Sequence, residues 1–101
     1  MPGTVRLDVD THQHSSVPFD ADVVVIGAPP GATVSATLSE TRGRPPLFGP
    51  VTNTAVAGGS GQLTLTFSVL LQGPTLAVLL ASVSDDQGTF YPSDAERLEV
   101  L

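Results

Sequence analysis

Apolar and polar residues alternate with period two along much of this chain, which indicates β-strands with one buried face. The clearest alternation covers residues 63–69, where leucine, phenylalanine and valine alternate with threonine and serine. Residues 5–9 and 34–39 show the same pattern over shorter spans. Two runs, 23–26 and 76–83, are apolar at nearly every position, as expected of strands in the interior of a sheet. No window has the period of an amphipathic helix.

Glycine and proline separate these runs. The ten glycines and nine prolines are spread along the chain, and clusters at 28–31, 58–61, 72–74 and 85–88 each indicate a turn. The pattern predicts an all-β fold, a two-sheet antiparallel β-sandwich of immunoglobulin-like type, as a single domain over residues 1–101. The expected strands, about seven, are 5–9, 22–27, 34–39, 51–56, 63–69, 76–84 and 97–101. Residues 11–20 are expected to form a loop or a weak edge strand.

In such a sandwich the two apolar runs lie on the central strands and face each other across the core. Residues 76–83 leave two phases open, because either Leu76, Val78 and Leu80 or the alternating set from Ala77 to Val83 can face outwards. The core candidates are Val5, Leu7, Val9, Val23, Val25, Val34, Leu38, Leu63, Leu65, Phe67, Val78, Leu80 and Leu98.

Two residue types are missing, and each absence excludes a kind of chemistry. Without cysteine there are no disulfides, thiolate metal sites or cysteine nucleophiles. All four basic residues are arginine, so Schiff-base chemistry, a Walker-type phosphate loop and Lys–Asn isopeptide cross-links are excluded as well. Stability therefore has to come from packing of the alternating strands.

The net charge of −6 argues against nucleic acid and anionic membranes as partners. Much of this charge lies between Asp8 and Asp22, whereas residues 63–83 carry almost none. That uncharged half is where a protein partner, flanking domains or another copy of the chain is expected. No apolar stretch is long enough to span a membrane, and the N-terminus does not read as a signal peptide. The chain is therefore expected to be cytoplasmic or part of a larger exported or virion protein.

The turn sequences carry a resemblance to a known class of domain. They are Val-Val-Val-Ile-Gly-Ala-Pro-Pro-Gly-Ala-Thr-Val at 23–34, Gly-Gly-Ser-Gly-Gln-Leu-Thr-Leu-Thr-Phe at 58–67 and Val-Ser-Asp-Asp-Gln-Gly-Thr at 83–89. In this order they resemble bacterial immunoglobulin-like modules. The chain is loosely similar to fibronectin type III modules and to apoproteins of the neocarzinostatin type, which hold a small ligand beside the sandwich. The resemblance implies architecture more than activity.

The most suggestive polar cluster is at the N-terminal end. If the first strand continued through His14, the side chains of Asp8, Asp10, His12 and His14 would share one face, with Asp20 and Asp22 following the loop. Imidazoles and carboxylates of this kind bind divalent ions such as Zn²⁺, Ni²⁺ or Cu²⁺. A solvated strand face accounts for the same pattern and is the better interpretation, so we expect no metal site. If one is present, His12, His14 and Asp10 are its candidate ligands.

Other motifs favour turns and loops over chemistry. Residues 85–88 offer clustered oxygen ligands for Ca²⁺ but lack the spacing of an EF-hand, so a turn is the better interpretation. Residues 58–62 fail the nucleophile-elbow pattern because Gln62 replaces its last glycine. We therefore expect no catalytic residues, no cofactor and no enzymatic activity.

The apolar excess is the feature most suited to an interaction. An outward-facing set of Leu76, Val78 and Leu80, joined by Leu47 and Phe48, would form a surface for a protein partner. The sequence thus predicts a non-catalytic structural, adhesion or protein-interaction module of a larger bacterial or phage protein or assembly. One alternative is a small-ligand carrier that uses the loops at 29–32 and 85–91. Another is a divalent-metal-binding accessory domain built on His12 and His14.

Overall fold

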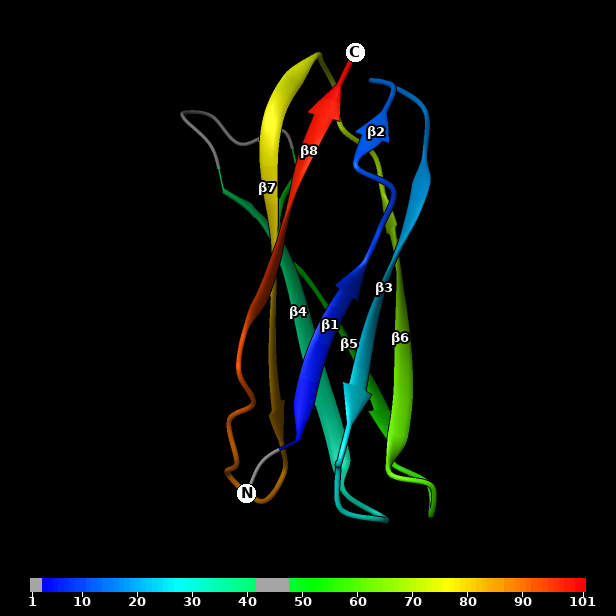
Figure 1. Ribbon diagram of the computed structural model, residues 1–101, viewed down its shortest axis with the longest axis vertical. Helices are drawn as coiled ribbons and strands as arrows, with labels where there is room; N and C mark the ends of the chain where they lie inside the picture. The colour runs from blue at the N-terminus through cyan, green and yellow to red at the C-terminus, as the bar shows by residue number, and fades with distance from the viewer. Residues whose placement is uncertain (1–2, 42–47) are drawn as a thin grey trace.

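Two β-sheets packed face to face make up this computed structural model, which describes residues 3–41 and 48–101 (Figure 1). The described residues form the strands β1 (Thr4–Asp8), β2 (His12–Gln13), β3 (Phe19–Ile26), β4 (Thr33–Thr41), β5 (Val51–Val56), β6 (Gln62–Val69), β7 (Thr75–Asp85) and β8 (Asp94–Val100). No helix in these two ranges is long and apolar enough to cross a membrane. The predicted all-β, two-sheet sandwich of immunoglobulin-like type is confirmed.

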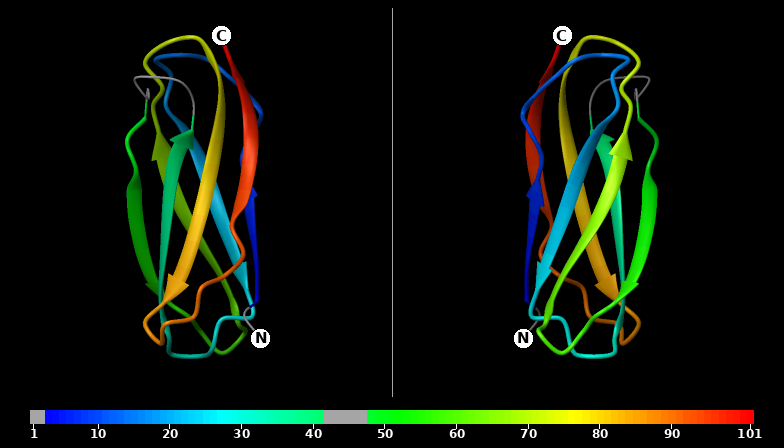
Figure 2. Two further views of the ribbon diagram at one scale, coloured as in Figure 1. Left: turned by 90° about the vertical axis from the view of Figure 1, so that its left-hand side faces the viewer. Right: turned by 90° about the vertical axis from the view of Figure 1, so that its right-hand side faces the viewer.

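The apolar runs occupy the positions that the sequence predicts for them. The smaller sheet has the strand order β1-β3-β6, and the larger has the order β2-β8-β7-β4-β5. Each strand pairs antiparallel with its neighbours, except that β2 runs parallel to β8. Thus β3 and β7, which contain the two apolar runs, lie inside their sheets, and the two sheets are layered in both side views (Figure 2).

The chain changes sheets after Asp8. β1 pairs with β3 in the smaller sheet, whereas β2 places His12 opposite Glu99 and Gln13 opposite Val100 in the larger one. Asp10 shapes the crossing, because its Oδ1 accepts a hydrogen bond from the His12 N–H at 3.1 Å. The first strand therefore does not continue through His14, which was the premise for a shared face of carboxylates and imidazoles.

The core forms between the facing sheets. Among its fully buried members with the largest side chains are Phe67, Leu38, Leu71, Leu79 and Leu98. Eight of the core candidates are buried, and three more pack against them in part, namely Val5, Val9 and Leu63.

The phase of β7 is the point at which the predicted core is wrong. Ala77, Leu79, Ala81 and Val83 are buried, whereas Val78 and Leu80 lie on the outer face of the larger sheet. Both faces of this run are apolar, so its alternation carries no information about which face is covered. The outward set is therefore Leu76, Val78 and Leu80.

Single polar side chains bridge the two sheets at their borders. The Leu7 N–H in β1 donates to Asp94 Oδ2 of β8 at 2.7 Å. At the opposite border, Asn53 Nδ2 of β5 donates to the Thr66 carbonyl of β6 at 2.7 Å. β1 and β6 are the edge strands of the smaller sheet, so some of their backbone groups point away from it. Each bridge supplies a hydrogen-bond partner to one such group.

Candidate functional site

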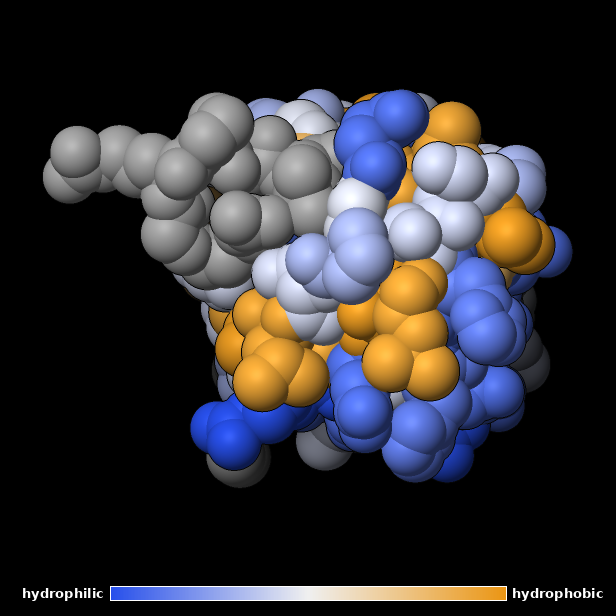
Figure 3. All heavy atoms as spheres, turned by 90° about the horizontal axis from the view of Figure 1, so that it is seen from above, coloured by the Kyte–Doolittle hydropathy of each residue, from blue (hydrophilic) through white to orange (hydrophobic). Residues whose placement is uncertain are grey.

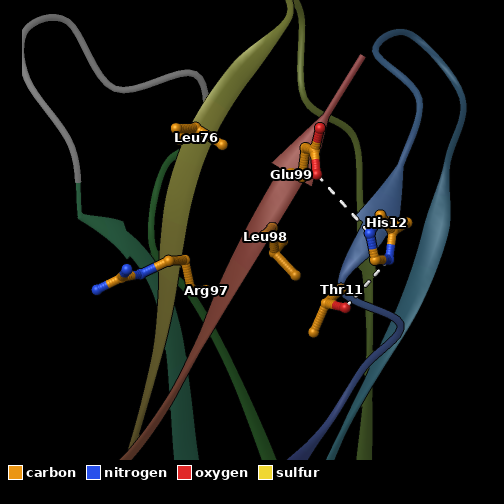
Figure 4. Close-up of a pocket in the computed structure, with 6 residues that line it drawn as sticks. All are labelled: Thr11, His12, Leu76, Arg97, Leu98 and Glu99. Atoms are coloured by element: carbon orange, nitrogen blue, oxygen red, sulfur yellow. Dashed lines mark hydrogen bonds and ion pairs between the residues drawn. The ribbon is translucent and has the colours of Figure 1, made fainter.

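A pocket of about 300 Å³ lies where β2 meets β8, at one border of the larger sheet (Figure 4). It is lined by Thr11, His12, Leu76, Arg97, Leu98 and Glu99. The volume is at the lower end of the range for small-molecule sites. Polar groups from the N-terminal crossing therefore meet apolar groups from the central strands at this place.

Strand pairing explains how these residues come together. The side chains of β8 alternate, so Arg97 and Glu99 face outwards while Leu98 is fully buried. Antiparallel pairing sets Leu76 of β7 beside Glu99. On the other side of β8, the short parallel pairing with β2 sets His12 beside the same carboxylate. Glu99 is thus flanked by an apolar side chain and an imidazole.

His12 has a polar partner at each ring nitrogen. Its Nε2 lies 3.7 Å from Glu99 Oε2, and its Nδ1 lies 3.3 Å from Thr11 Oγ1. Both side chains are well exposed, His12 by 77% and Glu99 by 54%. Arg97 extends away from His12 in the close-up, so its positive charge does not occupy the space between imidazole and carboxylate (Figure 4). The pair is open to solutes that approach from solvent.

The six acidic and histidine side chains that would gather if the first strand continued through His14 do not form one cluster. Asp8 and Asp22 are opposite each other in the smaller sheet, whereas His12 belongs to the larger one. Across residues 3–41 and 48–101, no group of three or more His, Cys, Asp or Glu side chains could hold a metal ion. Of the candidate ligands, His12 lines the pocket and Asp10 supports the crossing through its backbone contact. His14 is exposed on the segment that follows β2.

The predicted interaction residues fall in different places. Leu76 is 72% exposed, and Val78 and Leu80 continue the same outer stripe in a half-buried state. Phe48 packs against the core instead of facing a partner, and Leu47 lies outside the described residues. That a protein partner covers the stripe stays a prediction.

No motif or periodicity in the sequence singles out Thr11, Arg97 or Glu99. Glu99 is one of several acidic residues, and its importance depends on the parallel pairing of β2 with β8. β2 has only two residues, which is too short for a recognisable hydrophobic periodicity in the sequence. The only signal was the run of polar residues around His12, which marked that segment but not its partner.

The acidic turn at 85–88 is structural. Asp85 Oδ1 accepts hydrogen bonds from the backbone N–H groups of Gln87 and Thr89, each at 3.0 Å, and Oδ2 accepts one from the Tyr91 hydroxyl at 3.1 Å. The Thr89 hydrogen bond, with those of Gln87 and Tyr91, holds the pKa of Asp85 below its ordinary value of 3.8 against the effect of desolvation. The carboxylate is therefore committed to the turn, as the turn interpretation predicts.

The fold and this pocket define an immunoglobulin-like β-sandwich with a small pocket at one sheet border, where polar and apolar side chains meet. No protein-family model matches the chain, and no curated protein matches it by sequence. Among solved structures it is similar to superoxide reductase (neelaredoxin) from Ignicoccus hospitalis and to two variants of that protein. Each match has a TM-score of 0.67 and 20% identity, and covers 99% of this chain and 82% of the other.

These matches correct three predictions. The chain was expected to resemble bacterial immunoglobulin-like and fibronectin type III modules or neocarzinostatin-type apoproteins, but its whole length matches the fold of superoxide reductase. A non-catalytic structural or adhesion role and the absence of enzymatic activity were also predicted, and the match to superoxide reductase structures contradicts both predictions. At 20% identity the match shows the fold and assigns no activity to this chain. The turn motifs behind these predictions specify the architecture of a sandwich, which many unrelated functions share.

The described residues do not form a closed redox centre. Reduction of superoxide consumes an electron, which a redox-active group has to supply. The chain has no cysteine, and the described residues contain no cluster of three or more ligands. A structural or catalytic metal site usually has three or four protein ligands. In place of such a centre the pocket contains one exposed imidazole and one exposed carboxylate, those of His12 and Glu99.

Proposed function

We propose that this chain binds a divalent transition-metal ion between His12 and Glu99, and that this ion is the centre of its chemistry. The separation of 3.7 Å between Nε2 and Oε2 is the observation that carries the proposal. Two ligand atoms that share a Zn²⁺ ion at ~2.1 Å and a tetrahedral angle are ~3.4 Å apart. A shift of a few tenths of an ångström, well within the freedom of exposed side chains, brings both atoms to this distance.

Thr11 supports the proposal through the second ring nitrogen. When Nδ1 of His12 carries the proton, it donates to Thr11 Oγ1 at 3.3 Å, and Nε2 then presents its lone pair to a metal. A hydrogen bond of this kind selects the tautomer and restrains the ring. Metal-binding histidines generally have such a partner on the nitrogen that does not bind the ion.

Exposure and charge favour access by a cation. Both side chains are more than half exposed, so water can fill the remaining coordination positions. The net charge of −6 raises the local concentration of cations. With only two protein ligands, we expect modest affinity, a Kd of about 10⁻⁴ M or ~5.5 kcal/mol.

Isothermal titration calorimetry with Zn²⁺ and with Cu²⁺ at pH 7.5 tests the proposal. Glu99→Gln and His12→Gln are each expected to weaken binding by at least about tenfold, or ~1.4 kcal/mol. Glu96→Gln is the matched control, since it removes the same charge from β8 outside the pocket, and His14→Ala controls for the other imidazole. Heats equal to dilution for the unmodified protein, or equal losses in the controls, would rule out the site.

Action on superoxide is a second candidate function, and it is supported by the fold match over 99% of the chain. A redox-active ion in the pocket would supply the electron chemistry that the side chains lack. The test follows superoxide decay after pulse radiolysis with metal-free protein and with protein loaded with Mn²⁺, Fe²⁺ or Cu²⁺. Faster decay that disappears with Glu99→Gln supports the activity. Decay at the uncatalysed rate in every sample would mean that this chain shares the fold of superoxide reductase but does not act on superoxide.

A further inference from the structure

The border of the larger sheet at β5 lacks the features that usually protect an edge strand. Its sequence, Val-Thr-Asn-Thr-Ala-Val, contains no charged residue, no proline and no glycine. Five of its six residues are exposed, with Val51 at 40% and Val56 at 63%. Within the described residues, β5 pairs with β4 alone, and it lies at the border of the molecule in both side views (Figure 2).

The other borders are protected. β1 carries Arg6 and Asp8, and its Leu7 N–H is bonded to Asp94. β2 has only two residues. β6 also contains no charged residue, proline or glycine, and its protection is the hydrogen bond that its Thr66 carbonyl accepts from Asn53 of β5. Charges, short length and capped backbone groups are the usual means by which proteins prevent strands from pairing at an edge. Among the edge strands of residues 3–41 and 48–101, β5 is therefore the one that we take as most open to another strand.

We propose that β5 pairs antiparallel with β5 of a second copy of this chain, so that two larger sheets join into one. Pairing about a two-fold axis at Asn53 places Thr52 opposite Thr54 of the second copy and Val51 opposite its Ala55. Threonine pairs are favourable across strands, and no like charges meet. The same two-fold pairing of β1 would place Arg6 opposite Arg6 of the second copy, where the two positive charges repel each other. Pairing through β5 avoids this repulsion.

The surroundings of β5 allow a second acidic chain to approach. The outer face of the neighbouring strand β4 presents Ser35, Thr37 and Ser39, which are uncharged. Thr37 Oγ1 and Thr52 Oγ1 lie 2.8 Å apart, which fixes the outer side chain of β5 against β4. A strand that is already ordered loses little conformational entropy when it pairs. This neutral border is where two copies of charge −6 repel each other least.

A second surface competes with this one. At the end of the molecule seen in Figure 3, several apolar patches lie between polar side chains. The segments that meet at this end are joined by backbone hydrogen bonds from Ser15 to Leu101 and from Ser16 to Leu71, each 2.7 Å. Leu70 and Leu101 are exposed by 39% and 64%. The experiment must distinguish this end from the β5 border.

Sedimentation velocity of the full chain over roughly 10 µM to 1 mM measures self-association. Thr54→Lys places a lysine on the exposed outer side of β5 and is expected to weaken the dimer at least about tenfold. Ser82→Lys is the matched control, because it adds the same charge to the same sheet face on β7, away from the border. Val56→Lys serves as a second edge variant if Thr54→Lys fails to fold.

Amide exchange provides a direct readout, since self-pairing protects N–H groups of β5 as the concentration rises. A protein that stays monomeric at 1 mM overturns the proposal. So does a dimer that resists both edge lysines and is lost with Leu70→Ser, because that result places the contact at the apolar end. This inference does not depend on a bound metal, so its failure and that of the metal site are distinguishable.

Discussion

Asp85 and Tyr91 form a buried polar pair whose members each depend on the other. Tyr91 is 5% exposed, and its hydroxyl donates to the carboxylate that also holds the turn after β7. Burial raises the pKa of Tyr91 above its ordinary value of 10.0, and the hydrogen bond to Asp85 raises it further. The folded state therefore prefers an ionised Asp85 beside a neutral Tyr91.

This preference predicts the pH dependence of stability. The pKa of Asp85 is depressed on folding, so its contribution is present above pH 3.8 and is lost as the pH falls through the lower folded-state pKa. The pKa of Tyr91 is raised, so its contribution is present below pH 10.0 and is lost as the pH rises through the folded-state pKa. Urea unfolding from pH 2 to 11 measures both limbs. Asp85→Asn should remove the contribution of this carboxylate to the acid limb and reduce the basic limb, where desolvation still raises the pKa of Tyr91. An unchanged acid limb in this variant would contradict the assignment.

Tyr91→Phe removes one hydroxyl and leaves the ring in place. The lost hydrogen bond is expected to cost about 1 kcal/mol, which lowers the Tm by about 4–8 °C for a domain of this size. Differential scanning calorimetry at pH 7 measures the shift. Phe90→Leu is the control, since Phe90 is 79% exposed and its substitution should leave the Tm nearly unchanged.

At the scale of the strands, the phase of β7 determines which of its apolar side chains are buried in the core. Its buried set begins at Ala77, and its outer set begins at Leu76. A shift by one residue would exchange the two faces, because side chains alternate along a strand. The hydrogen-bonded registers with β4 and β8 hold the observed phase.

Two neighbouring leucines test this phase. Leu79 is fully buried, so Leu79→Ala should destabilise the protein by about 2–5 kcal/mol. Leu80 lies half-buried on the outer face, and Leu80→Ala should cost far less. Chemical denaturation of both variants gives the comparison. Equal losses would mean that the strand has no defined phase in solution.

The bridge at the first sheet border is a second element to test. Asp94→Ala leaves the buried Leu7 N–H without its acceptor and should cost about 1–3 kcal/mol. The amide hydrogen of Leu7 should also exchange faster in this variant than in the unmodified protein. Glu96→Ala removes an equal charge two residues further along β8 and should leave Leu7 protected. Unchanged exchange in Asp94→Ala would show that the bridge does not hold the border.

The elements differ in how far the sequence could predict them. Residues 63–69 alternate cleanly, and β6 begins one residue earlier and ends at the same position. β5 has the predicted bounds. The pairing of β2 with β8 could not be predicted, because it depends on where the chain crosses between sheets and not on any local period. The His12–Glu99 pair follows from that crossing, which is why the sequence identified one half of the site.

At the scale of the whole molecule, the long axis follows the strands, with extents of 40 × 21 × 17 Å. The pocket and the open β5 edge lie at opposite borders of the larger sheet, whose strand order is β2-β8-β7-β4-β5. Pairing through β5 would therefore leave both pockets free at the two far borders. Metal binding and self-association are expected to be independent for this reason.

The net charge of −6 predicts how salt affects self-association. Two copies repel each other over a Debye length of about 10 Å at 0.1 M salt, which shrinks to about 3 Å at 1 M. The dimer should therefore strengthen severalfold between 50 and 500 mM NaCl, as sedimentation velocity at both concentrations would show. Weakening with salt would contradict this expectation, because it would indicate an interface held by ion pairs.

The crossing after β1 has a mechanical consequence. β1 begins and β8 ends at opposite ends of the long axis (Figure 1), and β2 runs parallel to β8, the last strand. Tension applied through the ends pulls these parallel neighbours in opposite directions, so their bonds bear the load together in shear. Those bonds run from Glu99 to Thr11, from Leu101 to Gln13 and from Ser15 to Leu101. Stretching the protein thus places the segment that carries His12 under shear against β8.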